Sequence, residues 1–208
     1  MNLLAVTKTC PGVSVRAAFD AGQRDFGENY VQEALAKIAE LADLRADLRW
    51  HLIGPLQSNK AREVATHFDW VHAVDRMKLA QRLSDLRPAD LPPLQVCLQV
   101  NISGEDSKSG VAPEAALALA HDVARLPRLK LRGLMAIPEA AGDLAAQRAP
   151  HRALRKLFEA MNAEGLGLDT LSIGMSADLE AAIAEGATWV RIGTAIFGSR
   201  PAKPEPTS

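Results

Sequence analysis

The sequence predicts a single (β/α)8 TIM barrel of the α/β class, and three observations lead to this fold. Short apolar runs rich in β-forming residues alternate with longer helical patterns along the chain. The short runs number eight, as a closed barrel requires. No GxGxxG turn follows the first run, and polar, Gly-rich strand ends fall near both ends of the chain. Barrel closure brings these two ends together, whereas the alternative, an open doubly wound sheet, need not.

The expected strands lie at residues 3–7, 25–27, 50–54, 70–74, 94–101, 130–136, 170–173 and 189–192. The expected helices lie at residues 13–21, 30–44, 59–66, 76–86, 113–125, 147–162 and 178–185. Ser58 is placed to cap the third helix, Pro113 opens the fifth, and Gly186 ends the last. Residues 143–150 are interpreted as a loop and a helix start.

The second helix has the clearest division into two faces. Apolar residues recur at helical spacing, at Ala34, Leu35, Ile38, Leu41 and Ala42. Glu33, Lys37 and Glu40 take the other side.

The bulk composition predicts one domain over residues 1–200 and a disordered, Pro-rich tail at 201–208. The 24 basic and 25 acidic residues are interspersed, so nothing resembles a nucleic-acid footprint. The two cysteines form no CxxC pair, which is typical of a reduced compartment. No signal peptide or membrane-length apolar run is present, and we expect a cytoplasmic monomer with no membrane partner.

The first candidate for chemistry is Lys8, which ends an otherwise apolar first strand. In this fold the functional site lies at the C-terminal ends of the strands. Desolvation of an ammonium group lowers its pKa and makes the amine a candidate for Schiff-base formation. The alternative is a lysine that extends to water at the barrel rim.

A phosphate site is expected at the ends of the last two strands. Ser176 follows Gly174 after the seventh strand, and Gly193 and Thr194 follow the eighth. Glycines let backbone amides approach a phosphate, and hydroxyl groups add donors. Adjacent strands lie about 4.8 Å apart, so closure brings these residues within reach of Lys8. A pyridoxal ring could span the gap, although a Gly-Thr pair is also compatible with a simple turn.

Arg191 adds a third element at the same end of the barrel. It shares a strand face with Gly193, while Val190 and Ile192 point the other way. A guanidinium group only donates hydrogen bonds, so it would keep a neighbouring pyridine nitrogen unprotonated. Such a ring is a poor electron sink. The alternative is an ion pair between Arg191 and a strand-end carboxylate such as Glu28.

Seven motifs in order make the chain resemble the pyridoxal phosphate homeostasis proteins from residue 3 to about residue 200. They are AVTKT at 5–9, FGENYVQE at 26–33, WHLIGPLQSNK at 50–60, SKSG at 107–110, RGLMAIP at 132–138, LSIGMS at 171–176 and RIGTAIFG at 191–198.

The resemblance implies a fold-type-III barrel, like that of alanine racemase without its C-terminal β-domain, that binds pyridoxal 5'-phosphate (PLP). It implies that Lys8 holds the cofactor, Arg191 meets the ring nitrogen and Asn29 lines the pocket. By the same resemblance, Ser176, Gly193 and Thr194 hold the phosphate. Family members usually begin with a helix before the lysine-bearing strand, and here Met1 stands almost on that strand.

Other candidate residues are weaker. His51 could face the barrel mouth, but a hydrogen-bonded core histidine is the favoured interpretation. His67, His72, His121 and His151 show no metal-ligand spacing, so no metal is expected. Cys10 is interpreted as a small loop residue. Lys108, in a polar loop, could pass the cofactor in or out, but a solvated loop lysine is favoured.

Three functions remain open from the sequence. The favoured one is a PLP carrier without catalytic residues, which acts in cofactor homeostasis and passes PLP to apoenzymes. The second is a fold-type-III amino-acid racemase, which needs a second base. The only tyrosine is Tyr30, so no second base is evident. The third is a barrel that binds another phosphate, which requires that Lys8 form no Schiff base.

Overall fold

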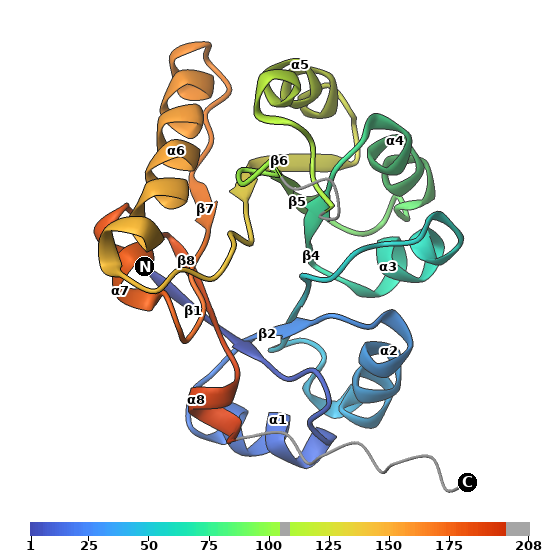
Figure 1. Ribbon diagram of the computed structural model, residues 1–208. Helices are drawn as coiled ribbons and strands as arrows, with labels where there is room; N and C mark the ends of the chain where they lie inside the picture. The colour runs from blue at the N-terminus through green and yellow to red at the C-terminus, as the bar shows by residue number, and fades with distance from the viewer. Residues whose placement is uncertain (105–108, 199–208) are drawn as a thin grey trace, which may run out of the picture.

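The computed structural model, which describes residues 1–104 and 109–198, is a closed barrel of eight parallel strands ringed by helices (Figure 1). The strands follow in chain order, and β8 closes the ring against β1 with Arg191 opposite Leu4. The predicted TIM barrel is confirmed. The predicted disordered tail at 201–208 and Lys108 lie outside the described residues.

The strands are β1 (Asn2–Val6), β2 (Asp25–Glu28), β3 (Arg49–Leu52), β4 (Trp70–Val74), β5 (Leu94–Gln99), β6 (Leu129–Met135), β7 (Thr170–Ser172) and β8 (Trp189–Ile192). The helices are α1 (Gly12–Asp20), α2 (Val31–Glu40), α3 (Ala61–His67), α4 (Met77–Leu86), α5 (Pro113–Ala124), α6 (Leu144–Ala163), α7 (Leu179–Ala184) and α8 (Thr194–Phe197). Two short 3-10 turns, Ala42–Leu44 and Ser58–Lys60, precede β3 and α3.

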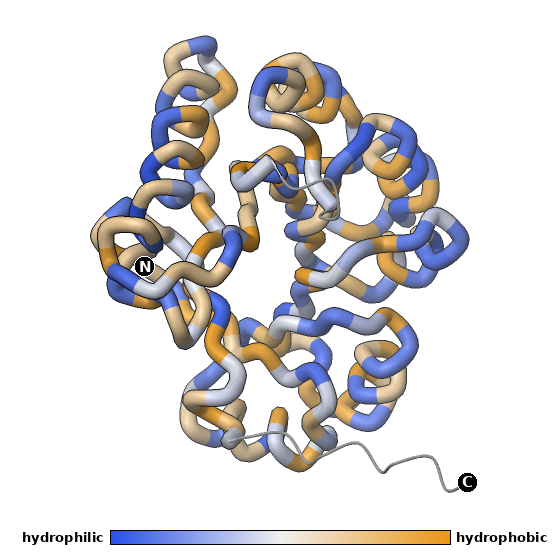
Figure 2. Tube along the Cα trace, in the orientation of Figure 1, coloured by the Kyte–Doolittle hydropathy of each residue, from blue (hydrophilic) through white to orange (hydrophobic). Residues whose placement is uncertain are grey.

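Alternation along the strands divides the core into an outer and an inner part. On β8, Val190 and Ile192 join the large apolar cluster between the strands and the helices. Trp189 instead belongs to a small cluster inside the barrel, and Arg191 is buried beside the barrel mouth. The predicted division of this strand into two faces is therefore confirmed. Figure 2 shows apolar residues on the strands and hydrophilic residues on the outer turns of the helices.

Several helix ends differ from the predictions. The segment 143–150 was expected to contain a loop, but α6 already begins at Leu144, and the Asp143 side chain accepts a hydrogen bond from the Ala146 amide at 2.9 Å. This N-cap starts the helix despite Pro150. Ser58 does not cap α3, since it lies in the 3-10 turn before that helix. The predicted roles of Pro113 and Gly186 are confirmed, the latter with a φ of +86°.

The short helix α8 was not expected, because its four residues are too few to show a period. It follows β8 directly and starts at Thr194 beside the barrel mouth. Within residues 1–104 and 109–198, no helix combines the length and apolar character needed to cross a membrane.

Candidate functional site

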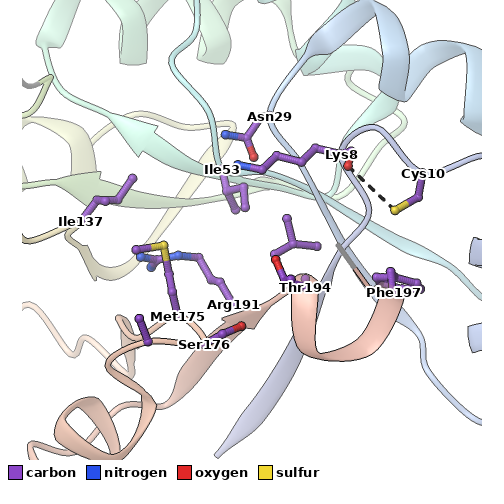
Figure 3. Close-up of a pocket in the computed structure, with 14 residues that line it drawn as sticks. Lys8, Cys10, Asn29, Ile53, Ile137, Met175, Ser176, Arg191, Thr194 and Phe197 are labelled. Atoms are coloured by element: carbon purple, nitrogen blue, oxygen red, sulfur yellow. Dashed lines mark hydrogen bonds between the residues drawn. The ribbon is translucent and has the colours of Figure 1, made fainter. Parts of the chain in front are cut away.

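A cavity of about 360 Å³ opens at the C-terminal ends of the strands (Figure 3). Its volume falls within the roughly 300–1,000 Å³ that is usual for small-molecule sites. All the predicted site residues line it, from elements at both ends of the chain: Lys8, Asn29, Ser176, Arg191, Gly193 and Thr194. The rest of the wall is mainly apolar: Val6, Cys10, Ile53, Ile137, Met175, Ala177, Phe197 and Gly198.

Lys8 lies in the turn that follows β1, on the face that Leu4 and Val6 turn to the barrel interior. Its side chain is half-buried and extends across the mouth of the barrel toward Asn29 (Figure 3). The next residue, Thr9, has a φ of +64°, which is unusual for a side chain with a branched Cβ. The turn is therefore held in a conformation that the surrounding structure must stabilise.

That stabilisation comes from a charged cluster beneath the turn. The ammonium group of Lys37, on α2, donates to the Thr7 carbonyl oxygen at 2.6 Å. It also donates to Glu28 Oε1 at 2.7 Å and to Glu33 Oε1 at 2.6 Å. Glu33 in turn accepts from the Thr9 amide. The cluster thus ties α2 and β2 to the turn that carries Lys8.

Lys37 lies on the polar side of the helical pattern, yet only 5% of the residue is exposed. Lys37 follows Glu33 by four residues, and this spacing is equally typical of a solvated ion pair on a helix surface. The sequence therefore contains no sign that Lys37 is buried. Glu28 is fully buried, and burial raises the pKa of its carboxyl although Lys37 and Thr7 oppose that shift.

Arg191 does not pair with Glu28, so that alternative is wrong. Its Nη2 donates to the Ala136 carbonyl oxygen at 2.8 Å, and its Nη1 donates to the carbonyl oxygen and to the hydroxyl of Ser172. Burial lowers the pKa of the guanidinium to about 10, partly offset by Asp178, so the group stays charged at neutral pH. The charge is therefore held at the wall of the cavity without a carboxylate in direct contact among the described residues.

The loop after β7 is held in one shape by Asp178. This carboxylate accepts from the Met175 amide at 2.7 Å and contacts His151 Nε2 at 2.9 Å. Burial opposes ionisation of Asp178, but the hydrogen bonds from His151 and Met175 lower its pKa overall. Gly174 has a φ of +91°, and a Cβ there would lie 2.5 Å from the Cβ of Ala182. These constraints place Ser176 at the rim of the cavity.

Asn29 and Gly54 pack against each other at the opposite side of the mouth. A Cβ on Gly54 would lie 2.3 Å from the Asn29 carbonyl oxygen, so only glycine allows the two backbones to approach this closely. The Asn29 side-chain oxygen is buried and has no hydrogen-bond partner within the described residues. A buried acceptor without a protein donor is suited to a donor from a ligand.

The remaining sequence candidates take other places. His51 is fully buried in the barrel interior and hydrogen-bonded to His72 and Asp25, so its interpretation as a core histidine is confirmed. Cys10 lines the cavity, and its amide donates to the Thr7 carbonyl oxygen at 2.9 Å. Tyr30 is 60% exposed at the start of α2 and is not part of the cavity wall. No three His, Cys, Asp or Glu residues are grouped to hold a metal ion in the part of the chain that the structure describes.

The chain matches the family model described as "Alanine racemase, N-terminal domain" over residues 1–201. A pyridoxal phosphate homeostasis protein of Pseudomonas aeruginosa is 66% identical over 200 residues, which cover 96% of this chain and 85% of the relative. The protein of the same name from Escherichia coli K12 is 55% identical over 201 residues, covering 96% and 86% of the two chains.

Solved structures show the same architecture. PipY of Synechococcus elongatus PCC7942 without PLP has a TM-score of 0.89 at 44% identity, covering 95% of this chain and 93% of that one. The same protein with PLP bound has a TM-score of 0.86 at 43% identity, with 95% and 92% covered. Alanine racemase from Corynebacterium glutamicum shares the fold alone, at 17% identity and a TM-score of 0.72, over 98% of this chain and 57% of the racemase.

Proposed function

Because the chain belongs to the family of pyridoxal phosphate homeostasis proteins, we propose that it binds PLP in the cavity at the barrel mouth and holds it covalently through Lys8. In this proposal the protein acts in cofactor homeostasis inside the cell, as a carrier that releases PLP to apoenzymes. One observation carries the proposal: an amine, a guanidinium group and two hydroxyl groups line one cavity.

The wall of the cavity fits the cofactor group by group. Lys8 and Arg191 stand on separate parts of the wall (Figure 3), which suits the aldehyde and the ring nitrogen of one flat ring between them. Ser176 and Thr194 supply hydroxyl donors beside Gly193, where a phosphate would lie. Ile53, Ile137 and Met175 offer apolar surface to the ring. The buried Asn29 oxygen offers an acceptor to a polar ring substituent.

When bound, PLP supplies an aldehyde carbon that condenses with a primary amine with loss of water. Lys8 presents that amine from a turn that the Lys37 cluster holds in place. Arg191 donates hydrogen bonds and accepts none, so it would donate to the lone pair of a ring nitrogen and keep that nitrogen unprotonated. The protein therefore stabilises a bound cofactor without enhancing its capacity to withdraw electrons.

The racemase alternative needs a base on each side of a substrate carbon. The chain has a single tyrosine, Tyr30, and it is exposed at the start of α2, away from the cavity wall. His51 and His72 are hydrogen-bonded inside the barrel. The relatives are named for homeostasis and not for a reaction. These observations favour a carrier.

The direct test is reduction of the PLP-loaded protein with borohydride, followed by peptide mass mapping. We expect the adduct on Lys8, and Lys8→Ala should lose the visible absorbance of the bound cofactor while keeping its fold. Lys60→Ala is the control, because Lys60 pairs with Glu63 at the surface and does not line the cavity. An adduct found mainly on Lys60 or Lys108 would overturn the assignment.

A second experiment separates carrier from enzyme. L-Alanine incubated with the loaded protein is followed by chiral chromatography, and reactivation of an added apoenzyme is measured in parallel. We expect reactivation and no racemisation at enzyme-like rates. Turnover of about 1 s⁻¹ or more, the low end of typical enzyme values, would contradict the carrier function.

A further inference from the structure

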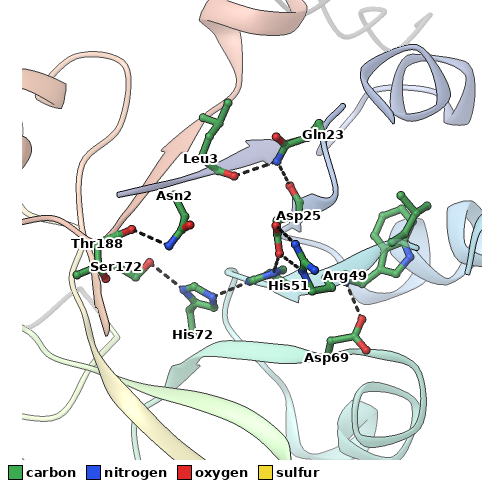
Figure 4. A network of polar contacts seen from close by, with 12 residues as sticks. Asn2, Leu3, Gln23, Asp25, Arg49, His51, Asp69, His72, Ser172 and Thr188 are labelled. Atoms are coloured by element: carbon green, nitrogen blue, oxygen red, sulfur yellow. Dashed lines mark hydrogen bonds and ion pairs between the residues drawn. The ribbon is translucent and has the colours of Figure 1, made fainter. Parts of the chain in front are cut away.

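A row of buried polar side chains crosses the interior of the barrel, and Figure 4 shows it from Asp25 to Ser172. Its last member, Arg191, lines the cavity. Its members, in order from the N-terminal face, are Asp25, His51, His72, Ser172 and Arg191. The successive contacts measure 3.1 Å, 3.0 Å, 2.8 Å and 3.0 Å. Each lies within ordinary hydrogen-bond distance, so the row is continuous. They come from β2, β3, β4, β7 and β8, so no single strand builds the row.

With both histidine rings neutral, the Asp25 end of this row sets the direction of its hydrogen bonds. The Asp25 carboxylate can only accept, so His51 donates to it from Nε2 and is left with an acceptor at Nδ1. His72 then donates from Nε2 to His51 Nδ1, and its own Nδ1 accepts from the Ser172 hydroxyl. At the other end Arg191 can only donate, so the Ser172 oxygen accepts from it. The two neutral rings are thus both protonated on Nε2.

The surroundings agree with two neutral rings. His51 and His72 are fully buried, and burial lowers the pKa of both. For His51 the nearby Asp25 carboxylate opposes this shift, whereas for His72 the neighbouring His51 and Arg191 add to it. The His51 ring stacks on Trp70 at 5.3 Å between ring centroids, with the planes 8° apart. An imidazolium in this position would therefore be poorly solvated.

We propose that Asp25, His51, His72 and Ser172 are positioning residues, which hold the Arg191 guanidinium in one orientation toward the bound cofactor. The effect on cofactor binding rests on the proposed function, whereas the hydrogen-bonded row is a feature of the protein alone. The hydrogen bonds of Arg191 to Ser172 and Ala136 use three of its five N–H donors. Two N–H donors remain for a ligand in the cavity. Their direction is set by the three N–H groups that donate to Ser172 and Ala136.

The row adds to simple anchoring because hydrogen bonds in series polarise one another in a medium of low dielectric constant. The Ser172 oxygen becomes a better acceptor for Arg191 when its proton is drawn toward His72. The far end is fixed by Asp25, which pairs with Arg49 at 2.6 Å on the N-terminal face. The orientation of a cavity side chain is thus connected to an ion pair at the other face of the barrel.

Ser172→Ala tests the inference, because it removes the hydroxyl from the row and keeps the carbonyl oxygen to which Arg191 also donates. Thr170→Val is the matched control on the same strand. Thr170 is also buried, but its hydroxyl donates to Asp169 and takes no part in the row. Both variants are compared with the wild-type chain by nuclear magnetic resonance of isotope-labelled arginine and histidine side chains, before any cofactor is added.

In the wild-type chain we expect His51 and His72 as neutral Nε2–H tautomers and sharp, slowly exchanging Arg191 guanidinium signals. Ser172→Ala should shift the His72 Nδ1 signal and broaden the Arg191 signals, and Thr170→Val should leave both unchanged. On titration with PLP, Ser172→Ala should bind roughly tenfold more weakly than the control, as expected for a lost hydrogen bond to a charged group.

An Nδ1–H tautomer of His72, or equal changes of the Arg191 signals in the two variants, would overturn the inference. So would Arg191 signals in Ser172→Ala that match those of the wild type. A wild-type chain that fails to bind PLP would refute the proposed function instead, since the side-chain signals are measured on the protein alone.

Discussion

The two walls of the cavity are held by different kinds of buried interaction. The lysine wall carries Lys8 and is supported from beneath by an ion pair between Glu28 and Lys37, whose ammonium group also donates to the Thr7 carbonyl oxygen. The arginine wall carries Ser176, Arg191 and Thr194, and Arg191 is held by hydrogen bonds to the carbonyl and hydroxyl oxygens of Ser172 behind it. In the first wall a full positive charge lies between carboxylates. In the second, the charge of Arg191 is dispersed over neutral groups.

This difference determines how each wall should respond to the loss of one side-chain group. Loss of one member of a buried ion pair leaves an uncompensated charge, which is more costly than loss of the pair as a whole. Loss of one hydroxyl from a hydrogen-bonded wall removes a single interaction and leaves the others in place. We therefore expect the buried support of the lysine wall to control stability, and the arginine wall to control the non-covalent part of the affinity for the cofactor.

The largest effect should come from Lys37→Met in the lysine wall. The variant leaves the Glu28 carboxylate without the Lys37 charge that compensates it. The Glu28 side chain is fully buried, and its Oε2 already lacks a hydrogen-bond partner among the described residues. We expect a loss of about 3–5 kcal/mol in the free energy of unfolding, measured by urea denaturation. The difference in the free energy of unfolding should shrink at acid pH, because protonation of Glu28 removes its uncompensated charge.

Two controls test this explanation. Lys37→Met combined with Glu28→Gln should recover much of the stability, because it removes both charges. Lys78→Met, on the exposed face of α4, should change stability by less than about 0.5 kcal/mol. Equal losses for Lys37→Met and Lys78→Met would show that the buried cluster does not hold the lysine wall.

The same contrast explains what the sequence could predict. The alternation of strands with helices predicted the barrel, and the position of Lys8 at the end of the first strand placed it at the barrel mouth. The two-residue period of a strand placed Arg191 on the same face as Gly193. The burial of Lys37 was not predictable, because residues spaced like Glu33 and Lys37 occur equally on solvated helices. Nothing in the sequence marks that this helix face is covered by the turn after β1.

The row from Asp25 to Arg191 was also not predictable from the sequence. His72 and Ser172 are 100 residues apart, and their contact depends on the barrel register and on side-chain direction. His51 was correctly interpreted as a core histidine, yet its partners could not be named. Local patterns thus located the candidate residues, while the three-dimensional arrangement decided which of them touch.

In the arginine wall, Thr194→Val and Ser176→Ala should each weaken PLP binding by about 1.5–3 kcal/mol, since each removes a hydroxyl donor to a charged phosphate. Their stability should stay close to that of the wild type, because both side chains are exposed at the rim. The measurement compares binding of PLP with that of pyridoxal, which lacks the phosphate. Variants that prefer PLP as strongly as the wild type does would place the phosphate site elsewhere.

A third prediction tests the junction of Asn29 and Gly54 at the opposite rim. Gly54→Ala adds a Cβ that would lie 2.3 Å from the Asn29 carbonyl oxygen, so the backbone must move. We expect a loss of about 1–3 kcal/mol in stability, as for an overpacked site, together with weaker PLP binding. Gly142→Ala is the control, because nothing lies within 4 Å of the added Cβ there. Similar losses for the two variants would contradict the close approach of Asn29.

The smallest effect concerns Asp25, at the far end of the row that leads to the arginine wall. Burial opposes its ionisation, but the hydrogen bonds from Arg49 and His51 outweigh burial and lower the pKa from 3.8 to about 2. A carboxyl group with a lowered pKa in the folded state stabilises the fold while it is ionised. The contribution is therefore complete above about pH 4 and is lost as the pH falls through about 2.

If the whole pKa shift of Asp25 were converted into stability, it would contribute about 2.5 kcal/mol to the free energy of unfolding. Because Arg49 is partly exposed, solvent screening reduces the expected contribution to about 1–2 kcal/mol. Asp25→Asn should therefore lower the free energy of unfolding by this amount near pH 6, and the difference from the wild type should vanish as the pH approaches 2. Asp47→Asn, at an exposed position, should show no such convergence. The measurement is urea denaturation of the three proteins at several acid pH values. A difference that persists unchanged down to pH 2 would mean that Asp25 acts through packing alone, and the arginine wall would then have no charged group fixing its far end.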